Sequence, residues 1–181
     1  GAAVYALAIA FAFLALAALY ESWGLPLAIM LSVPAAVLGA LLFTGGMHLF
    51  DPLYVNDVYL QISLVMLIGL AAKNAILVVE YADRLFREQG MSLMDAAVGA
   101  ARIRLRPIFM TAFSFILGVL PLVFASGVYA TARNIMGVAL IGGMLFATLL
   151  GIFLYPALYY LVGRVGGFER RRERQKTNVQ P

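Results

Sequence analysis

Lys73 is the residue of this chain whose type and surroundings point most directly to chemistry. It lies in the apolar stretch VYLQISLVMLIGLAAKNAILVV, residues 58 to 79. An ammonium group near the centre of a bilayer costs roughly 2.5 to 3.5 kcal/mol on insertion scales, so ionisable residues at such positions mark ion or proton pathways. Lys73 therefore predicts a functional charge rather than a structural one.

The acidic residues of this sequence are not placed to neutralise Lys73 at mid-membrane. Glu80 shares much the same helix face, but two turns separate it from Lys73 by about 10 Å, too far for a direct pair. We therefore expect the counter-charge on another segment. The nine acids all fall at the end of an apolar run or outside one: Glu21, Asp51, Asp57, Glu80, Asp83, Glu88, Asp95, Glu169 and Glu173.

Three further polar residues could join Lys73 in a polar track from the cytoplasm to the membrane centre. Asn74 follows it on the same helix, Thr111 lies about one turn into the next membrane span, and Arg104 precedes that span. Each also has an ordinary interpretation. Thr111 could bond its own helix backbone, and Arg104 could anchor the chain at the lipid headgroups.

The elements that position these residues are membrane-spanning helices. Hydrophobic residues make up 64% of the 181 positions and charged residues only 12%, which is typical of a polytopic membrane protein. A span needs roughly 20 apolar residues, and strand-like alternation is absent, which argues against a barrel. The sequence predicts an all-α transmembrane helix bundle over residues 1–165, with five spans at about 2–20, 26–46, 58–80, 107–125 and 134–162.

The third helix should continue beyond the membrane. The segment after Glu80 keeps good helix formers, and a spacing of four pairs Asp83 with Arg87 and Arg84 with Glu88. Gly90 is then expected to end the helix.

A short amphipathic helix should follow, lying on the cytoplasmic membrane surface. Ser92 with Asp95 three residues later predicts a capping box at its start. Pro107 is expected to open the fourth span. The basic tail, residues 166–181, loses its hydrophobicity, so we expect it to be disordered with its arginines near anionic lipid headgroups.

Small residues predict close contacts between helices. Gly39 lies in the second span, and the fifth contains a series of small residues at spacings that allow close approach. That series is Gly137, Gly142, Gly143, Ala147 and Gly151.

Basic residues indicate the orientation of the bundle. Of thirteen lysines and arginines, eleven fall between the third and fourth spans or after the fifth. The positive-inside rule puts these connections and the C-terminus in the cytoplasm, and five spans then leave the N-terminus outside. Orientation explains the net charge of +4 more simply than nucleic-acid binding does.

Catalytic and metal chemistry find little support. The sequence has no cysteine and a single histidine, His48, so it offers no thiolate site and no histidine cluster. We predict neither an enzyme nor a bound cofactor. The chain also starts without an initiator methionine or a targeting signal, and we therefore interpret it as a piece of a longer protein.

Three segments resemble a known family. ALYESWGLPLAIMLSVP, NDVYLQISLVMLIGLAAKNAILVVEYA and RIRLRPIFMTAFSFILGVLPLV resemble helices of resistance-nodulation-division multidrug efflux pumps, in the hydrophobe/amphiphile branch. The resemblance runs from about Ala15 to Arg164 and implies the last five of twelve helices, in the bacterial inner membrane with a periplasmic N-terminus.

This resemblance implies a proton-driven drug antiporter. In such an antiporter the protons are the coupling ions, and they pass paired aspartates on a helix that this sequence lacks. The resemblance implies that Lys73, Thr111 and Arg104 match positions of the proton relay, with a weaker match for Asn74. It also implies a homotrimer, a periplasmic adaptor, an outer-membrane channel, and amphiphilic drugs bound in periplasmic domains outside this sequence. The alternatives are a non-transporting membrane scaffold, a small channel, or a related exporter of metals or lipids.

Overall fold

The chain folds into helices throughout the part that the structure describes. The structure, a computed structural model, describes residues 2–20, 24–54 and 57–179 and so leaves out Glu21. Five of its helices are long and apolar enough to cross a membrane, which confirms the predicted class. The helices are α1 (Ala2–Tyr20), α2 (Gly24–His48), α3 (Val58–Glu88), α4 (Leu93–Val123), α5 (Ala130–Val165) and α6 (Phe168–Val179).

Local signals fix both ends of α3 and the start of α4. The Asp57 carboxylate accepts hydrogen bonds from the backbone N–H groups of Tyr59 and Leu60, at 3.0 and 3.1 Å, and so satisfies donors that a helix start leaves free. Gly90 takes a positive φ of 71° just after α3, as predicted. Ser92 Oγ accepts the Asp95 N–H at 3.2 Å, which confirms the predicted cap.

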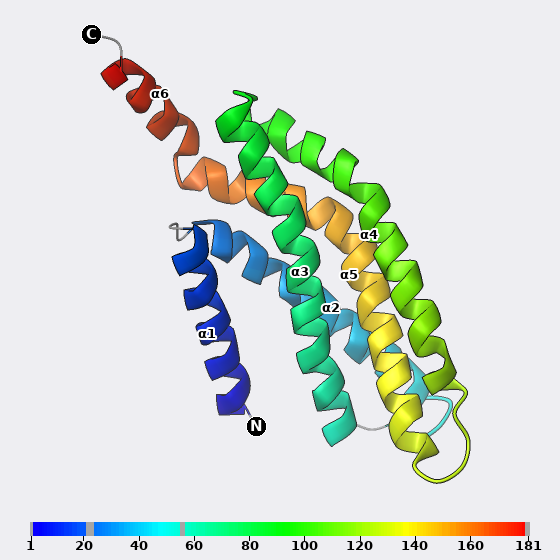
Figure 1. Cartoon of the computed structure of the whole chain (residues 1–181). Coiled ribbons are helices and arrows are strands. Elements are labelled where there is room, and N and C mark those ends of the chain that lie inside the picture. Colours follow the sequence, from blue (N-terminus) through cyan, green and yellow to red (C-terminus); the bar gives the residue numbers. More distant parts are fainter. Residues whose placement is uncertain (1, 21–23, 55–56, 180–181) are drawn as a thin grey trace.

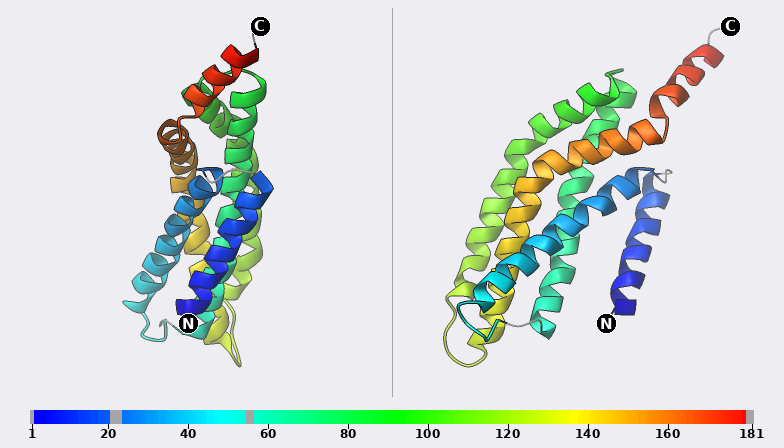
Figure 2. Two further views of the ribbon diagram at one scale, coloured as in Figure 1. Left: turned by 90° about the vertical axis from the view of Figure 1, so that its left-hand side faces the viewer. Right: turned by 180° about the vertical axis from the view of Figure 1, so that it is seen from behind.

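Helix α5 is the centre of the bundle. It contacts α2, α3, α4 and α6, and Figure 1 shows it running between α3 and α4. Helix α2 crosses it obliquely, while α1 packs against α2 and leans away from the other helices (Figure 2). Most of the side chains described on α1 are exposed; Tyr5, Ala12, Phe13 and Leu16 are half-buried, and Ala17 is buried.

Glycines allow α2 and α5 to approach closely, as predicted. A Cβ at Gly39 would meet the Phe146 side chain and would lie 2.7 Å from the Gly142 carbonyl oxygen. A Cβ at Gly142 would in turn overlap Phe43, and one at Gly143 would overlap Leu67 of α3. The large side chains of one helix therefore occupy the space left by glycines of the other.

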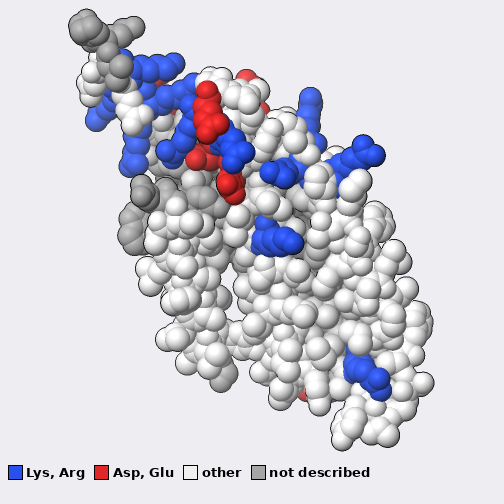
Figure 3. All heavy atoms as spheres, viewed as in Figure 1, with Lys and Arg blue, Asp and Glu red and all other residues white. Residues whose placement is uncertain are grey.

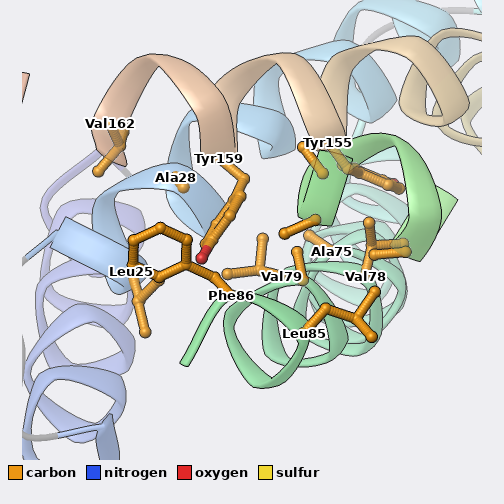
Figure 4. Close-up of a cluster of buried hydrophobic side chains, with 14 of the residues drawn as sticks. Leu25, Ala28, Ala75, Val78, Val79, Leu85, Phe86, Tyr155, Tyr159 and Val162 are labelled. Atoms are coloured by element: carbon orange, nitrogen blue, oxygen red, sulfur yellow. The ribbon is translucent and has the colours of Figure 1, made fainter. Parts of the chain in front are cut away.

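The largest buried cluster lies toward the basic end of the bundle. Figure 4 shows the Tyr159 ring of α5 between α2, which supplies Leu25 and Ala28, and α3, which supplies Val79 and Phe86. Tyr159 has no exposed surface. The same cluster includes Leu93 of α4 and Phe168 of α6. It therefore joins α2, α3, α4, α5 and α6 at the level where α3 continues beyond the apolar span.

The predicted surface helix and the fourth span are one continuous helix. Pro107 lies inside α4, which runs for 31 residues and is visibly bent (Figure 1). Proline removes one hydrogen bond and kinks a helix without having to end it when good helix formers stand on both sides. Leu93 meets Gly163 of α5, and Gly99 lies against Leu85 of α3, so one face of this segment packs on α3 and α5.

The tail forms a helix instead of the expected disordered segment, as far as its described residues extend. Its Arg, Glu, Gln and Lys residues are good helix formers, and contacts hold α6 in place. Phe168 is buried, the Arg172 guanidinium lies 4.9 Å from the Phe86 ring centroid, and Arg172 donates to the Met91 carbonyl at 2.9 Å.

We expect Gly39→Leu to destabilise the bundle, because the new side chain would collide with Phe146 and the Gly142 carbonyl. Overpacking of this kind costs about 1 to 3 kcal/mol. Denaturant unfolding in detergent micelles measures the change. Gly45→Leu is the matched control on the same helix, since a Cβ there meets nothing within 4 Å; equal losses for both variants would contradict the close contact.

Candidate functional site

Lys73 lies on the face of α3 that the rest of the bundle leaves uncovered. Its neighbours on this face are Ile62, Met66 and Gly69, all exposed. The opposite face of α3 is buried against other helices. Lys73 makes no hydrogen bond or ion pair within the described residues, so a charge inside an apolar span faces outward with nothing to neutralise it.

Asn74 points elsewhere. Consecutive helix residues lie about 100° apart, and Asn74 is only 2% exposed, with its amide nitrogen unpartnered among the described residues. It belongs to the interior of the bundle, one turn from the contact between Ala36, Ala71 and Ala147. The structure therefore does not bring Asn74 onto the face of Lys73.

Glu80 already has a partner. Its carboxylate lies 3.7 Å from the Arg84 guanidinium, so Arg84 pairs with Glu80 rather than with the predicted Glu88. The predicted pair of Asp83 and Arg87 is present at 2.9 Å. Glu80 is thus directed toward the basic end of α3.

Thr111 is exposed on α4, and its hydroxyl donates to the Pro107 carbonyl at 2.9 Å. This is the backbone bond that the ordinary interpretation of a helical threonine expects. It also satisfies a group beside the proline and leaves the oxygen lone pairs of the hydroxyl available to a further donor.

Arg104 lies against α3. Its guanidinium carbon is 5.2 Å from the Tyr81 ring centroid, within the range of a cation–π interaction. Its Nε is buried and has no hydrogen-bond acceptor in the described part of the chain. The ring of Tyr81 is therefore the group that holds this charge in position.

This contact sets the register between α3 and α4, which run in opposite directions (Figure 1). From the level of Tyr81 and Arg104, Lys73 lies about 12 Å back along α3, and Thr111 lies about 10 Å onward along α4. Both residues are consequently at nearly the same depth. The structure thus places Lys73 and Thr111 at one level of the bundle and Arg104 nearer the basic end.

Charge is distributed unevenly along the molecule. Figure 3 shows lysine and arginine side chains gathered at the end where α6 and the turn between α3 and α4 lie, while the opposite half is almost uncharged. The described residues contain no group of three or more metal-ligating side chains. The site can move or hold a charge, but it offers no ligand set for a metal ion.

Two contacts escape sequence reasoning. The Tyr159 hydroxyl donates to the Asp83 carboxylate at 3.4 Å, and Arg104 lies on Tyr81. Both join residues on different helices, and only the register of those helices reveals them. The signal in the sequence that could have indicated these contacts was an aromatic residue one or two helix turns from a charged residue.

The fold is that of a helical membrane protein with five candidate spans, and comparison with known proteins shows the family. Residues 2–163 match the model of the AcrB/AcrD/AcrF family. The chain belongs to this family of resistance-nodulation-division efflux permeases.

Individual relatives agree. The chain is 51% identical over 165 residues to the toluene efflux pump membrane transporter TtgB of Pseudomonas putida, covering 91% of this chain. It is 49% identical over 160 residues to the multidrug resistance protein MdtF of Escherichia coli, covering 88%. The matched part is 15% of the length of either relative.

We expect Tyr81→Ala to loosen the position of Arg104, because the ring is its described contact on α3. A double-mutant cycle with Arg104→Gln, followed by denaturant unfolding, should give a coupling of about 0.5 to 1 kcal/mol. Tyr81→Phe keeps the ring and should keep the coupling. A coupling near zero for the Tyr81→Ala pair would show that the ring does not hold the guanidinium.

Proposed function

We propose that the chain forms the C-terminal membrane portion of a proton-driven multidrug efflux permease, with Lys73, Thr111 and Arg104 in its proton relay. The observation that carries this proposal is the Lys73 ammonium, which has no partner among the described residues and faces outward from a candidate membrane span. The family supports export, since TtgB is named a toluene efflux transporter and MdtF a multidrug resistance protein.

The partner of Lys73 is a pair of aspartates on a segment outside this sequence, as the family resemblance implies. A nearby ammonium favours the charged form of a carboxylate. When a coupling proton neutralises that carboxylate, the attraction ends and Lys73 can move. Its exposed position on α3 suits this task, because the described residues do not hold it.

Thr111 supports the path at the depth of Lys73, and Arg104 extends it toward the cytoplasm. Thr111 is exposed, so the oxygen of its hydroxyl can accept a hydrogen bond from water in this path. Arg104 provides a positive charge one step nearer the basic end. Asn74 has the weaker claim, since its side chain lies inside the bundle and can act only by supporting α3.

The remainder of the proposal follows the family. The permease is a homotrimer of the bacterial inner membrane, with a periplasmic adaptor and an outer-membrane channel as partners. Amphiphilic drugs bind in periplasmic domains encoded outside this sequence, and the C-terminus is cytoplasmic. This portion supplies part of the relay, binds no cofactor, and carries no enzymatic activity.

Lys73→Ala in the full-length permease should abolish export of a fluorescent amphiphile while leaving assembly intact, because the charge that responds to protonation is gone. Lys176→Ala is the matched control, since Lys176 is the second lysine of this sequence and lies exposed on α6. Export is measured as dye efflux from energised cells, and assembly as the size of the purified complex. Normal proton-coupled export by the Lys73 variant would remove this residue from the mechanism.

Export should also require the segment with the aspartates. Cells that make only this chain should retain the fluorescent amphiphile. Cells that also make a matched N-terminal portion, with the aspartates and both periplasmic domains, should export it. Export by this chain alone would contradict the missing partner inferred from Lys73, and assembly of both portions without export would favour a scaffold.

A further inference from the structure

We propose that the basic end of the bundle holds one anionic glycerophospholipid, with an acyl chain in a groove between α4 and α5 and its phosphate at Arg164 and Arg170. The inference rests on two neighbouring hollows of opposite character. It does not depend on the proposed transport activity.

The first hollow is an apolar groove with a volume of about 470 Å³. It is open to the surroundings, since Met94 and Leu161 on its two sides are 58% and 54% exposed. The small side chains of Ala97 and Ala157 leave its floor low. The residues that line the groove include Met94, Ala97, Val98, Leu154, Ala157 and Leu161.

The second hollow is a basic pocket of about 410 Å³ at the junction of α5 and α6. Arg164 and Arg170 line it and have no hydrogen bond or ion pair within the described residues. Glu169 also lines it, but its carboxylate accepts the Leu93 backbone N–H at 3.4 Å. The pocket therefore offers two arginines that make no ion pair among the described residues, and with Glu169 counted its side chains keep a net positive charge.

The two hollows lie on one face of α5. Arg164 follows Leu161 by three residues and Ala157 by seven, spacings that put all three on the same side of a helix. The rise from Leu161 to Arg164 is about 4.5 Å. An elongated molecule lying in the groove would thus meet Arg164 at the end nearer α6.

This order of chemistry fits a phospholipid. The polar end lies at the basic end of the molecule, and the apolar groove runs back along α5 from Leu161 to Leu154, so a headgroup and an acyl chain can be held side by side. Arginine binds phosphate oxygens through two parallel hydrogen bonds. Basic pockets between helices on the cytoplasmic side recognise anionic headgroups, so we assign phosphatidylglycerol over zwitterionic phosphatidylcholine.

Fluorescence quenching by brominated lipid tests this assignment in the full-length permease. Phe153 is exposed one helix turn before Ala157 on the same face, so Phe153→Trp places a reporter beside the groove at little cost in volume. The protein is reconstituted in dioleoylphosphatidylcholine vesicles that contain rising fractions of dibrominated phosphatidylglycerol or dibrominated phosphatidylcholine. The quenching of the reporter itself is obtained by subtracting the signal of the protein that keeps Phe153.

We expect brominated phosphatidylglycerol to quench the reporter more strongly than brominated phosphatidylcholine does. Arg164→Gln with Arg170→Gln should reduce this lipid preference about thirtyfold, because two arginines are lost at the headgroup. Arg171→Gln with Lys176→Gln is the matched control. It removes the same charge from exposed positions of α6 outside both hollows and should keep the preference.

Equal quenching by the two brominated lipids, or an equal loss in the control, would overturn the site, because general surface charge would then explain the result. A soluble headgroup tests the acyl chain. Added sn-glycerol 3-phosphate should leave the quenching unchanged. Reversal of the quenching by this anion would show that the pocket takes a free phosphate and would overturn the lipid assignment.

Discussion

The cost of a charge inside the bilayer is the constraint on which this structure depends. An ammonium at mid-span costs roughly 2.5 to 3.5 kcal/mol, and the described bundle does nothing to reduce that cost at Lys73. One side of α3 packs against α2, α4 and α5, while the other side presents the lysine. One face of α3 is therefore packed against other helices, while the opposite face is exposed and carries the charge of Lys73.

Several contacts join the packed helices around α3 at the basic end of the bundle. Tyr159 packs in the cluster between α2 and α3, and its hydroxyl donates to Asp83. Arg172 connects α6 to the turn between α3 and α4 through its hydrogen bond to Met91 and its contact with Phe86. Arg104, held on Tyr81, ties the same ends of α3 and α4 together. These contacts join α2, α3, α4, α5 and α6 at the end of the bundle where the basic residues gather.

Much of the fold could be predicted from the sequence, because span length and hydropathy are local properties. The caps at Ser92 and Gly90 were predictable for the same reason. Pro107 and the tail were interpreted wrongly, since helix continuity across a proline and the docking of Phe168 depend on packing between distant segments. At the site, insertion cost singled out Lys73, whereas the contact between Tyr81 and Arg104 requires the register of two helices.

The contact between α2 and α5 has a consequence for how such chains can diverge. Each glycine there receives a particular large side chain: Gly142 receives Phe43, Gly39 receives Phe146, and Gly143 receives Leu67. At Gly142 a larger residue fits only if Phe43 becomes smaller. At Gly39 a Cβ would also meet the Gly142 carbonyl oxygen, a backbone contact that no exchange of Phe146 relieves. Relatives should therefore vary at Gly142 and Phe43 in compensating pairs and should keep Gly39 even where the overall hydrophobicity changes.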